Sequence, residues 1–312
     1  MDNSIIKQIF SNHNLEEPRS IKKIEIGFTN QIYSINDKFI LKICGNLDNE
    51  ENFKKEVFFY DFFKNEIPVP DVIVFDESKK MYDQIFMIYY KIQGDTLYSK
   101  WHLMADIERK KVIKQLCNIL KKINTFSYEE FTTKFKIKQT YNWHDKIINK
   151  IQNSLKQIEE KKLLSTNFIQ TIKKFVTNNH QVLVDQKLAL VYWDAHFDNI
   201  LVQNNQLVGI LDFERTELAS VDFSLDIIKR MVEYPKKYMS EEQEKFAKKE
   251  DYEHLLDWFR EFYPELFNFE NLDKRLDMYA VEHDLKTLLE WPNSKEVKQM
   301  IAKTVKYNCL EF

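Results

Sequence analysis

Three side chains within residues 191–214 have the types and the spacing that phosphoryl transfer requires. Asp194 follows the apolar run Leu188–Val191, and Asn199 lies five positions later. Asp212 ends a second apolar run, 18 positions after Asp194. A loop and a short hairpin would bring these side chains into one small volume. In phosphoryl transfer one carboxylate orients the attacking hydroxyl, while an amide and a second carboxylate hold Mg²⁺ on the nucleotide phosphates.

Each of these residues also has an ordinary structural interpretation. A lone aspartate in a loop is usually a turn or cap residue, and Asp198-Asn199 could simply start a turn. Asn204-Asn205 separates two β-like runs and is itself predicted to form a turn. The joint pattern is more specific: a strand, Asp-x-His-x-x-Asn, an apolar hairpin and Asp-Phe-Glu. This combination favours the functional interpretation.

The composition sets the class of protein. The chain has 312 residues, a length that is enough for two lobes with a sizeable core. Its 44% hydrophobic and 30% charged residues are the balance of a globular protein. A net charge of −3 provides no basic field for nucleic acid. We expect no membrane partner, because no apolar run reaches the ~20 residues of a transmembrane helix. The three cysteines form no metal or disulfide pattern, and we expect a reducing, cytoplasmic location.

The first part of the chain has the pattern of a small sheet with packed helices. Asn36-Asp37 has the composition of a tight turn between two strands. The helix after the third strand has a predicted buried stripe of Phe53, Val57, Tyr60 and Phe63 or Phe62. The expected elements are helices Ser4–Leu15 and Glu50–Asn65, and strands Ile24–Ile26, Ile32–Ile35, Phe39–Ile43, Val72–Phe75 and Gln84–Tyr90.

The second part is predicted to be mainly helical. Its expected helices are Ile107–Asn124, Trp143–Glu160, Asn167–Asn179, Asp222–Met231, Ser240–Tyr263, Leu272–Trp291 and Ser294–Tyr307. Gln93-Gly94 is the natural boundary between the two parts. We therefore predict an α+β, bilobal protein. Residues 1–93 would form a nucleotide-binding lobe with a hinge, and residues 94–312 a helical lobe with the catalytic loop and the acceptor site.

Several residues of the first lobe could bind a nucleotide. Gly27, Thr29 and Asn30 lie in a turn between strands, where backbone N–H groups could cover phosphates, although a glycine there is usually just a turn residue. Tyr89, Tyr90 and Lys91 lie in the segment expected to cross between the lobes. Its backbone would hydrogen-bond the purine, and its tyrosines could equally be core aromatics.

Lys42 is the candidate phosphate ligand. It lies on the third predicted strand among apolar residues, where a lysine often points to solvent. The functional alternative is a lysine that neutralises the α- and β-phosphates and pairs with a helix carboxylate. Glu56 is the best partner in the following helix, and Glu51 is the alternative.

Together these motifs make the chain similar to the aminoglycoside phosphotransferase and choline kinase superfamily, which shares the protein-kinase-like bilobal fold. The resemblance covers roughly residues 20–290. It implies that Asp194 is the catalytic base and that Asn199 and Asp212 are the Mg²⁺ ligands. It implies that Lys42 is the phosphate lysine. The motifs that carry it are Asp194-x-His196-x-x-Asn199, Asp212-Phe-Glu214, Asp222-x-x-x-Asp226, Ile67-Pro-Val-Pro-Asp71 and Ile92-Gln-Gly94.

Three positions depart from the family pattern. Tyr192 stands where the family commonly has histidine, and Asn124 stands where a helix-end histidine is frequent. Glu214 ends the metal-strand motif in place of glycine. The first two positions usually buttress the catalytic loop. The three core catalytic positions are intact, which favours an enzyme over a non-catalytic nucleotide-binding protein.

The predicted reaction transfers the γ-phosphoryl group of ATP or GTP to a hydroxyl of a small molecule, with Mg²⁺. A cationic amino sugar would need carboxylates, whereas choline would need an aromatic cage. We favour an aminoglycoside or a related hydroxylated amine, with choline, ethanolamine or homoserine as alternatives. We expect a monomer or a dimer. The candidate acceptor-site residues are Glu214, Asp251, Asp257, Glu261, Glu282, Trp258 and Trp291.

Overall fold

The structure is a computed structural model that describes residues 2–24, 30–45, 49–237 and 241–308. The chain divides into two compact units. The first comprises residues 1–119, 194–216 and 230–258, and the second comprises residues 120–193, 217–229 and 259–312. The lobe boundary predicted at residues 93 and 94 stays a prediction. No helix of the described ranges is long and apolar enough to cross a membrane.

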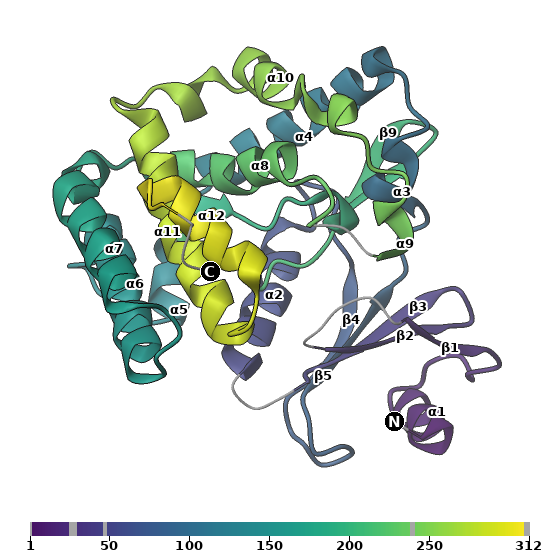
Figure 1. The fold of residues 1–312 in the computed structure, drawn as a ribbon. Coiled ribbons are helices and arrows are strands. Elements are labelled where there is room, and N and C mark those ends of the chain that lie inside the picture. Colours follow the sequence, from purple (N-terminus) through teal and green to yellow (C-terminus); the bar gives the residue numbers. More distant parts are fainter. Residues whose placement is uncertain (1, 25–29, 46–48, 238–240, 309–312) are drawn as a thin grey trace. The chain divides into compact units, whose positions relative to one another are not determined.

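The first unit contains a five-stranded antiparallel sheet in the order β1-β2-β3-β5-β4 (Figure 1). Helix α1 (Asn3–Asn12) packs its buried side chains Ile6, Ile9 and Phe10 against the sheet. In the turn between β2 and β3, Asn36 and Asp37 both have left-handed φ angles, which confirms the predicted tight turn. The strands are β1 (Ile21–Ile24), β2 (Gln31–Ile35), β3 (Phe39–Ile43), β4 (Val72–Asp76) and β5 (Phe86–Tyr90).

Helix α2 (Glu50–Phe63) packs against β4 and has a broader buried surface than its sequence predicted. Val57 is only half-buried, whereas Phe58 and Phe59 are buried. The prediction of a single stripe was therefore wrong at Val57. The physical reason is that Phe59 and Phe63 also pack against Phe213, so the helix is covered on more than one side.

A second sheet of the first unit carries the hairpin expected from the apolar runs. Strand β8 (Ile200–Gln203) lies between β6 (Asp95–Thr96) and β9 (Gln206–Ile210). Asn204 and Asn205 both have left-handed φ angles and join paired residues Gln203 and Gln206, which confirms the predicted turn. The two-residue turn fixes the register that places Asn199 before one strand and Asp212 after the other.

The single helix expected over Ser240–Tyr263 was wrong for the described part of that range. The chain instead forms α9 (Glu241–Glu244), a 3₁₀ turn at Lys249–Tyr252 and α10 (Leu255–Phe262). Tertiary contacts override helix propensity here. Asp251 accepts a hydrogen bond from Arg109 of α4 (Asp106–Thr125) at 2.7 Å. The carbonyl of Asp251 accepts another from the indole of Trp101, in α3 (Leu97–Trp101), at 2.9 Å.

The second unit is mainly helical. Helix α11 (Leu272–Glu290) packs against α6 (Trp143–Glu160) and α12 (Lys295–Val305), and Figure 1 shows these helices side by side. The remaining elements include α5 (Glu129–Lys134), α7 (Thr166–Asn179) and strand β7 (Leu188–Tyr192), with most of β10 (Thr216–Ser220), which pairs with β7, and most of α8 (Ser224–Glu233). The predicted α+β class, with an antiparallel sheet region and a larger helical part, is confirmed.

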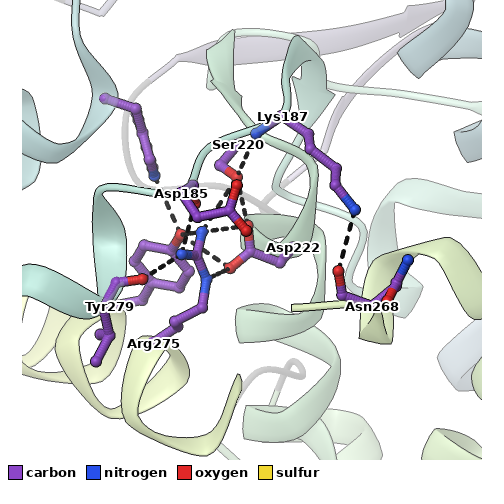
Figure 2. A network of polar contacts seen from close by, with 9 residues as sticks. Asp185, Lys187, Ser220, Asp222, Asn268, Arg275 and Tyr279 are labelled. Carbon is purple, nitrogen blue, oxygen red and sulfur yellow. Dashed lines mark hydrogen bonds and ion pairs between the residues drawn. The ribbon is translucent and has the colours of Figure 1, made fainter. Parts of the chain in front are cut away.

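Arg275 of α11 holds the polar centre of the second unit (Figure 2). Its side chain is fully buried and forms a two-pronged pair with Asp222, at 2.7 and 3.0 Å. The carbonyl of Asp185 accepts a further bond at 2.6 Å. Tyr279 donates to Asp222 at 3.0 Å, and Ser220 donates to the same carboxylate at 2.6 Å. Both members of the buried ion pair, Arg275 and Asp222, therefore have further hydrogen-bond partners, which a buried ion pair needs to offset its desolvation.

Candidate active site

Lys42 lies at the centre of a group of carboxylates in the first unit. Strand β3 places it between Ile32 of β2 and Met87 of β5. Its side chain is 5% exposed, and its Nζ lies 2.6 Å from Glu56, 3.0 Å from Glu214 and 3.9 Å from Asp212. A buried lysine needs such partners, because desolvation of an unpaired charge is costly.

Glu56, and not the alternative Glu51, is the helix carboxylate that reaches Lys42. Glu56 lies on the buried side of α2, whereas Glu51 is exposed and pairs with Lys55 at 3.1 Å. The five-residue separation turns the two glutamates toward different sides of the helix, since a helix has 3.6 residues per turn.

The charges of this group are strongly coupled. Burial alone would lower the pKa of Lys42, but Asp212, Glu56 and Glu214 together raise that pKa well above its ordinary value. Burial raises the pKa of Glu56 to about 8, although Lys42 opposes this rise. Asp212 and Glu214 raise the pKa of Glu56 further, because they add negative charge around the same lysine.

The same carboxylates have the donor set of a divalent cation site. One oxygen each from Glu56, Asp212 and Glu214 lies within 4.8 Å of the others. Three carboxylates face one ammonium group, so the site favours added positive charge. Carboxylate oxygens are the ligands that Mg²⁺ prefers. The residues present therefore fit Mg²⁺, with Asp212 as the predicted ligand and Glu214 beside it.

The predicted catalytic loop, residues 194–199, lies in the same unit and is hydrogen-bonded to the segment that follows β9 and carries Asp212. The Asn199 side chain donates to the carbonyl of Asp194 at 3.0 Å, and its amide nitrogen lies 3.1 Å from His196. With this nitrogen occupied, the amide oxygen is the atom left for a metal. The backbone N–H of Leu211 donates to the carbonyl of Asn199 at 2.9 Å. This bond ties the turn that carries Asn199 to the strand end that carries Asp212.

Asp194, the predicted base, lies close to a histidine of its own loop. Its side chain is 15% exposed, and its Oδ1 lies 3.6 Å from Nε2 of His196. In the second unit, the indole of Trp193 donates to Asp226 at 3.1 Å, so the residue immediately before Asp194 is fixed by a buried carboxylate. Asn124, which replaces the family's histidine, donates to the carbonyl of Leu190 on β7 at 2.6 Å.

The predicted nucleotide residues lie in different settings. Gly27 and Thr29 lie outside the described residues. Asn30 donates to Glu214, and its side-chain oxygen accepts from the backbone N–H of Gly45 at 3.1 Å. These bonds connect Asn30 to one of the carboxylates around Lys42 and to Gly45, in the loop after the third strand.

Two of the predicted hinge residues, Tyr89 and Tyr90, end strand β5, and the third, Lys91, follows it. Tyr89 is buried and its ring packs against Tyr60, whereas Tyr90 is 45% exposed. Lys91 pairs with Asp37, and its backbone N–H donates to the carbonyl of Lys38 at 2.8 Å. The predicted hinge segment is therefore anchored, at Lys91, to the turn between β2 and β3.

The candidate acceptor residues divide by burial and by partner. Glu214 contacts Lys42, and Asp251 is paired with the buried Arg109, so both already serve as partners of cations. Glu282 is 7% exposed and lies 3.8 Å from Lys150, and burial raises its pKa. The rest are the exposed Asp257, Glu261 and Trp291, and the buried Trp258.

Two functional-looking contacts were missed from the sequence. Tyr60 was interpreted only as a core aromatic, yet its hydroxyl contacts both Glu56 and the backbone of Asp212. Arg275 was not singled out at all, although it pairs with Asp222 of the recognised motif. Its position inside the apolar pattern of α11 was the one available signal, because a buried arginine must be paired.

Comparison with known proteins defines the class. The family model described as "Phosphotransferase enzyme family" matches residues 20–224, which is more than half of the chain. The chain therefore belongs to this family, as the sequence motifs predicted, and it is a phosphotransferase.

Solved aminoglycoside phosphotransferases share the fold. The chain is 17% identical to APH(2")-IIa in its streptomycin–ATP ternary complex, with a TM-score of 0.70 over 98% of this chain and 96% of that chain. It is 18% identical to ADP-bound APH(2'')-Ib, with a TM-score of 0.70 and coverage of 99% and 98%. A GDP and kanamycin complex of APH(2")-IIIa gives 15% identity and a TM-score of 0.69, with coverage of 98% and 97%.

One curated protein also matches part of the sequence. It is Protein argonaute from Marinitoga piezophila (strain DSM 14283 / JCM 11233 / KA3), which is 24% identical over 204 residues. The match covers 59% of this chain, and the chain spans only 28% of the length of that protein. At this identity and coverage the match shows no shared family.

Proposed function

We propose that the protein transfers the γ-phosphoryl group of ATP or GTP to a hydroxyl of an aminoglycoside or a related hydroxylated amine. One observation carries the proposal: the buried Lys42–Glu56 pair, at 2.6 Å, adjoins Asp212, and the neighbouring Leu211 is hydrogen-bonded to Asn199. These groups are the ones that nucleotide-dependent phosphoryl transfer uses. Three solved structures that share the fold are of aminoglycoside phosphotransferases with ATP, ADP or GDP bound.

Each residue has a distinct part in this proposal. Lys42, fixed by Glu56, neutralises charge on the α- and β-phosphates. Asp194 orients the acceptor hydroxyl and accepts its proton as the new P–O bond forms. Asn199 and Asp212 would hold Mg²⁺, which supplies positive charge to the phosphate oxygens when bound. Most of the rate gain would come from this positioning and charge stabilisation.

The acceptor preference follows from charge and burial. A quaternary ammonium would need an aromatic cage, but the helix aromatics Trp258, Phe259 and Tyr279 are buried, whereas Trp291 is exposed. The Tyr279 hydroxyl also belongs to the Arg275 network. Asp257, by contrast, is an exposed carboxylate with which a polycationic amine could pair. This distribution favours an aminoglycoside over choline.

The test is nucleotide turnover by the purified protein with Mg²⁺. ATP and GTP are each supplied with a panel of aminoglycosides, choline, ethanolamine and homoserine. We expect aminoglycoside-dependent release of ADP or GDP, and Asp194→Ala should lower kcat by about 10²–10⁴-fold, the usual range for a general base. Asp273→Ala, which removes an exposed carboxylate at the start of α11, is the matched control. Release with choline alone, or unchanged turnover in Asp194→Ala, would contradict the proposal.

A further inference from the structure

The hydroxyl of Tyr60 joins two parts of the site that are far apart in sequence. It donates to Oε1 of Glu56 at 2.6 Å and accepts the backbone N–H of Asp212 at 2.9 Å. The other oxygen of Glu56 accepts from Lys42, also at 2.6 Å. A continuous hydrogen-bonded path therefore runs from the main chain of Asp212 through Tyr60 and Glu56 to Lys42.

The main chain of Asp212 is in a conformation that needs support. Its φ is 59°, in the left-handed region that residues with a side chain seldom adopt. The preceding N–H groups of Ile210 and Leu211 donate to the carbonyls of Pro68 and Asn199, at 2.8 and 2.9 Å. The Tyr60 hydroxyl thus completes a run of three anchored N–H groups that ends at Asp212.

Tyr60 is itself held in a single place. It is 1% exposed, and its ring makes edge contacts with Tyr89 and Phe213 at centroid distances of 6.0 and 5.8 Å. Burial and the neighbouring Glu56 raise the pKa of the Tyr60 hydroxyl well above its ordinary value. The hydroxyl therefore keeps its proton, and it can donate to Glu56 while it accepts from Asp212.

We propose that Tyr60 is a positioning residue that sets the backbone of Asp212, and through it the metal-binding carboxylate, relative to the Lys42–Glu56 pair. The expected effect of the Tyr60 hydroxyl on turnover rests on the function proposed above. Its expected effect on metal-dependent nucleotide binding is independent of that function, because binding requires only that Asp212 and Lys42 act on the same Mg²⁺–nucleotide. Loss of the hydroxyl would leave the ring packing intact and remove the acceptor of the Asp212 N–H.

The experiment uses the full-length protein and the variant Tyr60→Phe. Tyr33→Phe is the matched control, because Tyr33 is 4% exposed, packs on the α1 side of the sheet and donates its hydroxyl to Gln31 at 3.2 Å. Calorimetric titration with a non-hydrolysable ATP analogue, at a series of Mg²⁺ concentrations, gives the Mg²⁺ concentration for half-maximal binding. Turnover and thermal unfolding are measured on the same preparations.

We expect Tyr60→Phe to raise the half-maximal Mg²⁺ concentration by about 5–100-fold, the effect of leaving one buried donor unsatisfied. The kcat should fall by a similar factor, while KM for the nucleotide at saturating Mg²⁺ changes less than about twofold. Tyr33→Phe should change neither quantity. A lower melting temperature in Tyr60→Phe with an unchanged Mg²⁺ requirement would mean a purely structural role and would overturn the inference.

The outcomes separate this inference from the proposed function. Wild-type protein that binds Mg²⁺–nucleotide but phosphorylates no acceptor removes the proposed function, and the Mg²⁺ requirement of Tyr60→Phe then decides the inference alone. Turnover by the wild type, with Tyr60→Phe behaving as Tyr33→Phe does, overturns the inference and leaves the function standing. Wild-type protein that binds no Mg²⁺–nucleotide overturns both.

Discussion

Replacement of Lys42 by methionine should destabilise the protein by an amount that grows with pH. Methionine keeps an unbranched apolar stem but removes the ammonium group that lies 2.6 Å from Glu56 and 3.0 Å from Glu214. Glu56 is 1% exposed at its side chain, so water cannot replace the lost partner. Asp212 is 37% exposed at its side chain, and solvent will screen its loss.

The direction of the pH dependence of stability follows from the pKa of Glu56. Burial raises this pKa to about 8 from the ordinary value of 4.5, so the folded protein binds the proton more tightly than the unfolded chain does. The stability linked to Glu56 is therefore fully present below pH 4.5 and is lost as the pH rises through about 8. Without Lys42 the pKa of Glu56 rises further, and ionisation at high pH leaves a buried carboxylate with no cation.

The expected loss of stability in Lys42→Met is smaller at pH 6 than at pH 9. At pH 6 the variant loses charged hydrogen bonds, and we expect a cost of about 1.5–3 kcal/mol. At pH 9 it also leaves an uncompensated buried charge, and we expect about 3–5 kcal/mol. Urea unfolding in metal-free buffer, followed by circular dichroism at pH 6, 7.5 and 9, measures the difference. The double variant Lys42→Met/Glu56→Gln should lose the added cost at pH 9.

Two results would refute this reasoning. One is a deficit for Lys42→Met that stays constant or shrinks between pH 6 and pH 9. The other is a double variant whose deficit equals the sum of the two single variants at pH 9, because groups in direct contact should not act additively.

Two further predictions concern the second unit. Arg275→Leu should lower the free energy of unfolding in urea by about 3–5 kcal/mol, because it leaves the buried Asp222 carboxylate without its cation. Lys229→Met is the control and should lower it by at most about 1 kcal/mol, because the pair of Lys229 with Asp277 is partly exposed. Equal losses in the two variants would contradict the assigned role of the network. Glu282→Gln should raise the melting temperature at pH 8 and leave it unchanged at pH 4. The reason is that burial raises the pKa of Glu282 and penalises its ionised form in the folded protein. A stabilisation that is as large at pH 4 as at pH 8 would contradict this explanation.

The spacing of residues along the chain was enough to predict which side chains form the candidate site. Asp194, Asn199 and Asp212 could be selected from sequence because a strand, a loop and a two-residue Asn204-Asn205 turn leave few geometries for the residues on either side. Strand β3 has the predicted bounds Phe39–Ile43, since an apolar run bounded by turn residues is a local signal. The family and the α+β class followed from the same motifs.

Only the tertiary structure decided which distant groups meet. Glu51 and Glu56 are equivalent by composition, and the facing of α2 against the sheet brings only Glu56 to Lys42. The run after Ser240 has helix-forming composition, yet contacts of Arg109 and Trp101 with Asp251 break the expected helix.

Tyr60 is the clearest case of what sequence leaves open. Helical periodicity predicts that its ring is buried, but periodicity contains no information on where the hydroxyl points. That direction depends on Asp212, 152 positions away, whose N–H meets the hydroxyl only when the segment that contains Asp212 and Phe213 packs against α2. Local pattern fixes which residues can do chemistry, and long-range packing fixes the hydrogen bonds that hold them in place.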